Sequence, residues 1–160
     1  MSFRCTTKVI KGAVDPETAT DVYNHLKDTI KWEESIRSRR EGNTFTRNGK
    51  SIDLAEYPRV LKIVLDVLDK FKSPYKYLIV GAYLNHYENG TMWSPNHTHQ
   101  GLHSLVISTG ATRNFVLGKK IVQVENGTAV MFGSANHGVP RMPEVTQGRI
   151  SIAVFLQPIN

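Results

Sequence analysis

The sequence predicts an α+β fold that is mainly β, in a single domain. Apolar residues recur at helical spacing in two segments before residue 75, and short β-rich runs separated by turns follow from residue 76. No linker is long enough to divide the chain, and 160 residues suit one hydrophobic core. We therefore expect one domain over residues 1–160, with a helical and basic N-terminal part (1–75) and a β core (76–160).

Both predicted helices begin at a proline. Asp15 can cap the first helix, Pro16 stands in its first turn, and the apolar spacing extends it to about residue 30. The second helix starts at Pro58, carries one apolar stripe opposite a polar face, and ends at residues 72–74. We expect the two helices to pack outside the β core.

The second half of the chain is predicted to be all β. The expected strands are residues 77–86, 104–109, 113–117, 120–124, 128–132 and 148–156. Asn89-Gly90 and Asn126-Gly127 mark tight turns between strands. The even spacing of these strands predicts a double-stranded β-helix, or jelly roll.

The composition is basic, with a formal net charge of +6. Such a charge favours polyanions such as nucleic acid, because neutralising phosphates releases counterions. Residues 31–50 hold six Lys or Arg against three Glu, with Trp32 and Phe45 among them, as in a nucleic-acid-facing loop. A solvated surface with ordinary charge scatter explains this segment equally well.

Nothing in the sequence indicates secretion or membrane insertion. No apolar run is long enough to span a bilayer, and the N-terminal segment lacks the apolar core of a signal peptide. The single Cys5 cannot form an internal disulfide. We expect an intracellular, soluble protein of the cytoplasm or nucleus, with no membrane partner and no protein partner inferred.

The last predicted strand places an arginine on an inward face. By strand alternation Arg149 shares its face with Ser151, Ala153 and Phe155, while aliphatic residues take the other face. A guanidinium in the interior needs a carboxylate to offset its desolvation, and no acidic residue nearby is an obvious candidate. A ligand carboxylate would serve this purpose.

The first strand of the β core shows the same alternation. Tyr83, Asn85 and Tyr87 share one face, and His86 has the opposite parity and is expected to face out. His103, at the entrance of the next strand, has no certain direction. We expect it at the surface or behind the site.

Histidines cluster after residue 93. His97 and His99 lie two apart, so on an extended strand they project to the same side and can reach one metal ion. Surface His-x-His pairs also arise by chance. The distant His137, in "NHGVPR", is a candidate third ligand.

This constellation resembles the AlkB-like branch of the Fe(II)- and 2-oxoglutarate-dependent dioxygenases, over about residues 77–157. In that family a strand carries Asn-x-Tyr, a loop carries His-x-Asp, and a distal His and a terminal-strand Arg complete the site. Here "NHYENGTMWSPNHTH" supplies Asn85, Tyr87, Gly90 and His97 at the family's spacing. "SLVISTGATRNFVL" is similar to the family's next hairpin, and "NHGVPR" and "GRISIAVFL" are similar to its last two strands.

The chain departs from the family pattern at two positions. His99 stands where the family has the metal-binding Asp, and Phe155 stands where a second arginine would fall. Three neutral imidazoles bind Fe(II) with a charge one unit more positive than two imidazoles and a carboxylate. This difference bears on oxygen activation and on metal preference.

The resemblance implies a dioxygenase that uses Fe(II), 2-oxoglutarate as co-substrate and O2. The implied catalytic residues and metal ligands are His97, His99 and His137. The implied 2-oxoglutarate contacts are Asn85, Tyr87, Arg149 and Ser151, with the arginine clamping the distal carboxylate. The implied substrate is a methylated base in nucleic acid, which is hydroxylated or demethylated.

A base and its phosphates need a π-face for stacking and cations for the backbone. The candidate residues are Trp93, Arg37, Arg39, Arg40 and Arg47. In an equally good alternative, Trp93 plugs the mouth of the barrel and the arginines pair with neighbouring glutamates.

Three other functions stay open. The oxygenase could act on a protein side chain or a free nucleobase, or the His99 change could leave a catalytically inactive AlkB-like protein that binds a ligand or nucleic acid. The third is a cupin-like three-histidine metalloprotein that does not use 2-oxoglutarate. An interior Arg149 argues against this last alternative, because its obvious purpose is to face a dicarboxylate.

Overall fold

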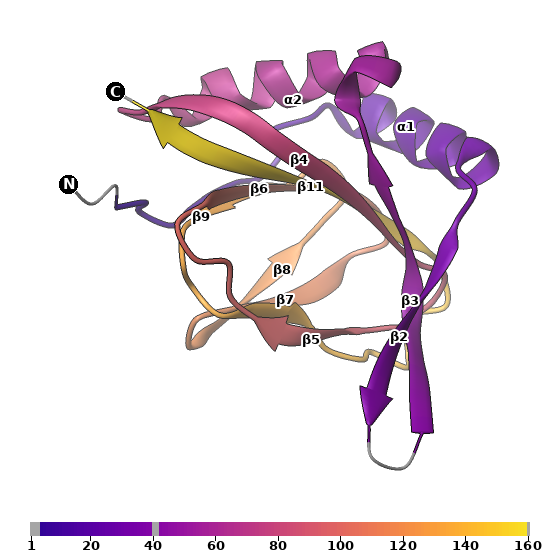
Figure 1. The fold of residues 1–160 in the computed structure, drawn as a ribbon. Coiled ribbons are helices and arrows are strands. Elements are labelled where there is room, and N and C mark those ends of the chain that lie inside the picture. Colours follow the sequence, from indigo (N-terminus) through magenta and orange to yellow (C-terminus); the bar gives the residue numbers. More distant parts are fainter. Residues whose placement is uncertain (1–3, 40–41, 160) are drawn as a thin grey trace.

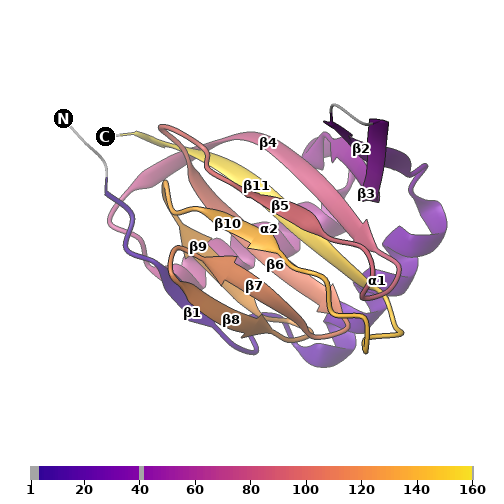
Figure 2. The same ribbon diagram turned by 90° about the horizontal axis from the view of Figure 1, so that it is seen from below.

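The computed structural model describes residues 4–39 and 42–159, without the side chains of 37–39, 42 and 43. Its strands form two antiparallel sheets that face each other without closing into a barrel (Figure 1). The larger sheet contains, in spatial order, β1 (Lys8–Ile10), β9 (Ala129–Phe132), β6 (His103–Gly110), β11 (Arg149–Ile159), β4 (Lys76–Tyr87), β3 (Gly42–Ile52) and β2 (Glu33–Arg39). The smaller sheet contains β5 (Ser94–His97), β10 (His137–Val139), β7 (Arg113–Leu117) and β8 (Lys120–Val124). Figure 2 shows the smaller sheet lying across the larger one.

Two helices cover the outer face of the larger sheet (Figure 1). Helix α1 (Pro16–Thr29) begins where the Asp15 side chain accepts a hydrogen bond from the backbone of Thr18, and helix α2 (Pro58–Phe71) follows the short 3-10 helix η1 (Leu54–Glu56). Both helices lie within one residue or so of their predicted bounds. Neither helix in the described parts of the chain is long and apolar enough to cross a membrane.

Alternation along β11 divides the interior into two parts. Ile150, Ile152, Val154 and Leu156 are fully buried in the core between sheet and helices. Burial of each such side chain contributes about 1.5–3 kcal/mol to stability. Their neighbours in the sequence, starting at Arg149, point into the space between the sheets. The predicted parity of this strand is therefore confirmed, and it gives the protein an apolar layer beside a polar pocket.

The six predicted strands are present, and the structure adds others. The segment 31–50, expected as a loop, forms most of the β2–β3 hairpin at the edge of the larger sheet, and the part of the hairpin remote from β4 projects beyond the other strands (Figure 1). Its sequence shows no strand signal because the residues of the hairpin are mainly polar and do not alternate with apolar ones. The strands expected from the sequence pattern did not include the short strands β1, β5 and β10, and only the family resemblance implied a strand at "NHGVPR", which contains β10.

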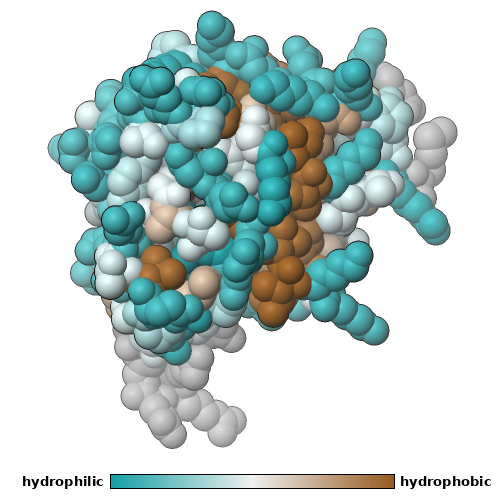
Figure 3. Space-filling model, turned by 180° about the vertical axis from the view of Figure 1, so that it is seen from behind, coloured by the Kyte–Doolittle hydropathy of each residue, from teal (hydrophilic) through white to brown (hydrophobic). Residues whose placement is uncertain are grey.

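One outer face of the molecule carries a stripe of hydrophobic side chains flanked by hydrophilic ones (Figure 3). The exposed large apolar residues of the described chain include Val9 of β1 and Ile121 of β8. These two strands lie at the same side of the molecule, remote from the β2–β3 hairpin (Figure 2).

Candidate metal centre and carboxylate pocket

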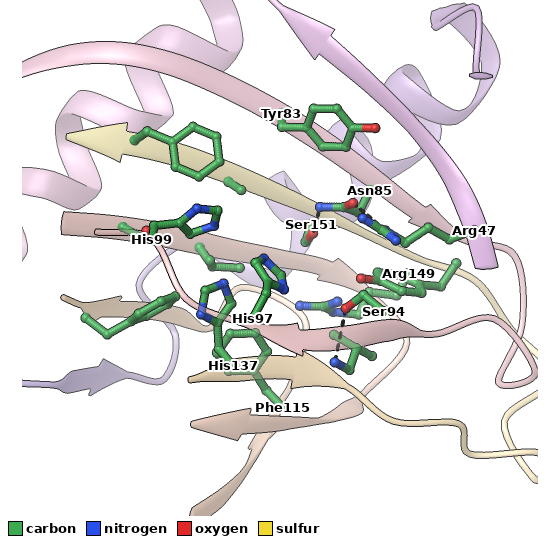
Figure 4. A pocket seen from close by; sticks show the side chains of 17 residues that line it. Arg47, Tyr83, Asn85, Ser94, His97, His99, Phe115, His137, Arg149 and Ser151 are labelled. Carbon is green, nitrogen blue, oxygen red and sulfur yellow. Dashed lines mark hydrogen bonds between the residues drawn. The ribbon is translucent and has the colours of Figure 1, made fainter. Parts of the chain in front are cut away.

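A pocket of about 260 Å³ lies between the two sheets. Its walls come from strands β3 to β7 and β9 to β11, so segments far apart in the sequence contribute side chains. Figure 4 shows three imidazoles on one side of the pocket and the polar group of Arg149, Ser151, Asn85 and Arg47 on the other. The pocket therefore has a histidine end and an arginine end.

Three histidines meet at one end of the pocket. His97 ends β5 and His137 begins β10, and the two residues are direct partners in the antiparallel register. His99 lies two residues beyond β5, in the loop before β6. One potential ligand atom from each residue lies within 4.8 Å of the others. The predicted convergence of these three residues is confirmed, and three imidazole nitrogens at this spacing form a donor set for one transition-metal ion.

Two of the histidines are oriented by backbone carbonyls. The Nδ1–H of His97 donates to the carbonyl of Pro95 at 2.9 Å, and the Nδ1–H of His137 donates to that of Ala135 at 3.0 Å. Because a carbonyl oxygen only accepts, these contacts fix the proton on Nδ1 and leave Nε2 free to bind a metal. His99 makes no hydrogen bond with the described residues, and its ring contacts the Phe155 ring with centroids 5.0 Å apart.

Burial favours the neutral imidazole at this end. The pKa of His137 is lowered to about 4. Desolvation is the largest cause, the neighbouring imidazoles of His97 and His99 act in the same direction, and the Ala135 hydrogen bond opposes them. Desolvation also lowers the pKa of His99, with a smaller contribution from His97. Since only a neutral imidazole binds a metal, both residues are ready ligands at neutral pH.

Arg149 dominates the other end of the pocket. It is 1% exposed, its Nη2 donates to Ser108 Oγ at 2.8 Å, and its Nε and Nη1 are buried with no hydrogen-bond partner. Burial lowers its pKa to about 10, so the guanidinium is still charged at neutral pH. The described residues that line the pocket include no Asp or Glu. A buried cation with unused donors is costly, and a ligand carboxylate would satisfy it.

The other predicted co-substrate residues also line the pocket. Asn85, Tyr87 and Ser151 are there, with the Asn85 Nδ2 donating to Ser151 Oγ at 3.3 Å. The Arg149 guanidinium lies 5.4 Å from the centre of the Tyr87 ring. Sequence reasoning missed Ser108, which is the register partner of Ser151 on β6. The shared inward parity of paired strands is the signal that could have found it.

A second buried arginine was also missed. Arg113 of β7 is fully buried, and its guanidinium donates to the carbonyls of Met92 at 2.7 Å, Pro140 at 2.9 Å and Asn89 at 3.3 Å. These bonds tie β7 to the segment before β5 and to the segment after β10. Arg113 thereby fixes the chain next to β5 and β10, the two strands that carry His97 and His137. It shares an inward parity with Phe115, which was the available signal.

The candidate substrate residues have different outcomes. Arg47 lines the pocket, and its Nε donates to Asn85 Oδ1 at 2.6 Å. Trp93 is not among the lining residues, and the guanidinium of Arg141 lies 4.8 Å from the centre of its ring. The predictions for Arg37, Arg39 and Arg40 concern side chains outside the described part of the chain.

Two further histidines differ from expectation. His86 has the predicted outward parity but is only 6% exposed, because Tyr23 of α1 and Trp32 cover it. His103 is 3% exposed, and its Nδ1 lies 2.7 Å from the Tyr77 hydroxyl. His86 is therefore not at the surface, and of the two positions expected for His103, at the surface or behind the site, the surface one is wrong. Neither lines the pocket.

Comparison with known proteins bears on the fold. No protein-family model matches the sequence, and no curated protein matches it. Among solved structures, an oxidoreductase of the 2OG-Fe(II) oxygenase family from Burkholderia pseudomallei is similar over 94% of this chain and 84% of that one, with a TM-score of 0.69 and 15% identity. A Pseudomonas putida prolyl-4-hydroxylase is similar over 96% of this chain and 93% of that one, with a TM-score of 0.58 and 12% identity. The predicted fold class is confirmed: the chain has the double-stranded β-helix fold found in structures of 2OG-Fe(II) oxygenases.

Proposed function

We propose that the protein is an Fe(II)- and 2-oxoglutarate-dependent dioxygenase. The observation that carries the proposal is the presence, in one pocket, of three imidazoles within ligand distance of one another and a buried guanidinium with two unpartnered nitrogens. The likeness in fold to oxygenase structures supports it. When bound, the iron and 2-oxoglutarate supply O2-dependent oxidation of a substrate C–H bond, with succinate and CO2 as co-products.

The chain's donor set fits such a metal. His97, His99 and His137 would hold it, and imidazole is a suitable ligand for iron. The common set in non-haem iron oxygenases is two histidines and one carboxylate, so this site differs by one ligand charge. Carbonyls behind two of the imidazoles engage their Nδ1 atoms and leave their Nε2 atoms free to bind the metal.

The arginine end fits a dicarboxylate. Arg149 would bind the distal carboxylate through one edge of its guanidinium, because such an edge matches two carboxylate oxygens; the unpartnered Nε and Nη1 each share an edge with Nη2, which keeps a second hydrogen beyond its bond to Ser108. Ser108 holds the remaining nitrogen and so fixes the direction of the fork. The pair Asn85 and Ser151 offers further polar contacts beside it. The buried Tyr87 ring, whose centre lies 5.4 Å from the guanidinium, helps to keep water from the charged contact.

For substrate we propose a methylated base in nucleic acid. The support is the net charge of +6, the basic β2–β3 hairpin beside the pocket, and Arg47, which belongs to that hairpin and reaches the pocket wall. A protein side chain is the second candidate. It is favoured by the structural likeness to a prolyl-4-hydroxylase.

Succinate formation tests the proposal. Purified protein with Fe(II), 2-oxoglutarate and ascorbate should release succinate, and the substrate should raise the rate. Methylated oligonucleotides and prolyl peptides, assayed separately, distinguish the two substrate classes. His137→Ala should abolish release. Bound metal without succinate under every condition would instead indicate an inactive binding protein.

A further inference from the structure

The three histidines of the metal centre are held in different ways. His97 and His137 lie on paired strands, and each has one ring nitrogen bonded to a backbone carbonyl. His99 lies on a loop, and neither of its ring nitrogens bonds to a described residue. Its orientation therefore depends on ring packing alone.

Ring contacts show what holds His99. Its ring lies 4.9 Å from that of His97 and 5.1 Å from that of His137, and both of these are candidate ligands themselves. The remaining aromatic contact is with Phe155, at 5.0 Å between centroids and an interplanar angle of 63°. Such an edge-on geometry is a favourable one for aromatic rings. Phe155 is thus the neighbour that supports His99 from outside the donor set.

Phe155 is paired on both sides within the larger sheet. It lies on β11, between β4 and β6, where Phe155 pairs with Gly81 on one side and Ser104 on the other. A Cβ at Gly81 would lie 3.5 Å from the Phe155 ring, in ordinary van der Waals contact. Strand pairing on both sides thus holds the backbone of Phe155, next to an irregularity in the β11–β4 register between Phe155 and Leu156, and its ring can support a loop residue that lies against it.

We propose that Phe155 is a positioning residue that holds the His99 imidazole in its metal-binding direction. The inference rests on the metal centre of the proposed function. The two positions at which the chain departs from the family pattern, His99 and Phe155, are then one structural unit, since they are in contact. An aromatic ring supports an imidazole without adding charge, whereas a cation at position 155 would lie beside an already positive metal site.

Co(II) is a suitable probe, because its visible absorption reports the number and geometry of its ligands. Phe155→Ala should weaken Co(II) binding roughly 10-fold, the low end of the range for groups that orient a ligand. His99→Ala should weaken it more. Adding Phe155→Ala to His99→Ala should produce no further loss, because the ring then has no ligand to orient.

The double variant decides the question. If Phe155→Ala weakens Co(II) binding by the same factor with and without His99, the ring acts through the fold and the proposal is overturned. Phe155→Tyr keeps the ring and should keep wild-type affinity and the wild-type spectrum. Loss of affinity in this variant would also count against the proposal.

Tyr83 provides a matched control. It lies on β4, faces the same pocket, and has no ring contact with a histidine among the described residues. Tyr83→Leu should leave Co(II) affinity unchanged. An equal loss in Tyr83→Leu and Phe155→Ala would show a general effect of the pocket wall.

Hydrogen exchange gives a readout apart from affinity. In the metal-free protein, Phe155→Ala should speed amide exchange in the 98–102 loop and leave β5 and β10 unchanged, and this also shows that the variant is folded. Unchanged loop exchange would contradict the proposal. Failure of the wild-type protein to bind Co(II) at all would instead reject the metal centre, so the two failures are distinguishable.

Discussion

Arg113 and Arg149, the two buried arginines among the described residues, lie near the same ring and differ in their partners. Their guanidiniums are 5.3 Å and 5.4 Å from the centre of the Tyr87 ring. Arg113 bonds to three backbone carbonyls and leaves only its Nε without a partner, whereas Arg149 donates from Nη2 to the Ser108 hydroxyl and keeps two buried nitrogens, Nε and Nη1, without a hydrogen-bond partner. The first arrangement completes the fold, and the second is complete only with a ligand.

Burial also has opposite consequences for charge at the two ends of the pocket, because an imidazole and a guanidinium start from different ordinary pKa values. Desolvation brings the pKa of His137 to about 4, below neutrality, and so removes its charge. Desolvation brings the pKa of Arg149 to about 10, which is still above neutrality. One physical cause therefore yields a neutral ligand for a metal at one end and a persistent cation for a carboxylate at the other.

The largest effect is expected for Arg113. Arg113→Met should lower the free energy of unfolding by about 3–5 kcal/mol, because buried carbonyls lose their donors. Chemical denaturation measures this change. Added 2-oxoglutarate should not remove the defect beyond its ordinary stabilisation of a folded protein. A loss below about 1 kcal/mol would show that water replaces the guanidinium at these carbonyls.

Arg149→Met should have the contrasting outcome. Removing an uncompensated buried charge should leave the metal-free fold as stable as the wild type or more stable. The affinity for 2-oxoglutarate should fall about 100-fold or more, since a buried charge pair loses one member. Isothermal titration in the presence of Co(II) measures this, and Co(II) affinity itself should be unchanged. A destabilised fold with normal 2-oxoglutarate affinity would reverse the roles of the two arginines.

Ligand addition sharpens the comparison. At 100 times its dissociation constant, 2-oxoglutarate should stabilise the wild-type protein by about 2.7 kcal/mol, because it binds the folded state alone. Thermal unfolding should show the full shift in wild type and a stabilisation of at most about 0.4 kcal/mol in Arg149→Met at the same concentration, because that concentration is then only about one dissociation constant of the variant. Chelation of the metal with EDTA should reduce the shift, because the co-substrate then keeps only its arginine contact. A shift of equal size in the variant would place the carboxylate elsewhere.

Much of the pocket was predictable, because alternation along a strand is a local property. The parity of β11 placed Arg149 and Ser151 inward, and that of β4 placed Asn85 and Tyr87 inward, as observed. The absence of a nearby acid indicated a ligand carboxylate. These predictions need only the sequence of one strand at a time.

The rest depends on contacts between remote segments. The register that sets His137 opposite His97 belongs to β5 and β10, which are too short and too polar to give a strand signal. Strand alternation correctly predicted that His86 points away from the pocket. It could not show that Trp32 and α1 cover that face of the sheet. The partners of Arg113 are carbonyls of loops, which carry no mark in the sequence.

The smallest expected effect concerns His86, on the far side of the sheet from the two arginines. Burial lowers its pKa, Lys27 lowers it further, and Glu88 opposes both. The unfolded chain therefore binds the proton more readily, so stability is fully present above a pH of about 6.5 and is lost as the pH falls below that value. In metal-free protein His137 contributes with the same sign.

His86→Phe should keep the ring packing against Trp32 and remove this share of the acid sensitivity. Between a pH of about 6.5 and 5, the variant should lose stability less steeply than the wild type, by at most about 1.4 kcal/mol per pH unit for one proton. Denaturant unfolding at several pH values in the presence of EDTA measures the two slopes. Equal slopes would mean that water reaches the buried Nδ1 and solvates the charged ring. Because this residue does not line the pocket, 2-oxoglutarate affinity should be the same in both proteins, which separates acid sensitivity of the fold from the chemistry of the site.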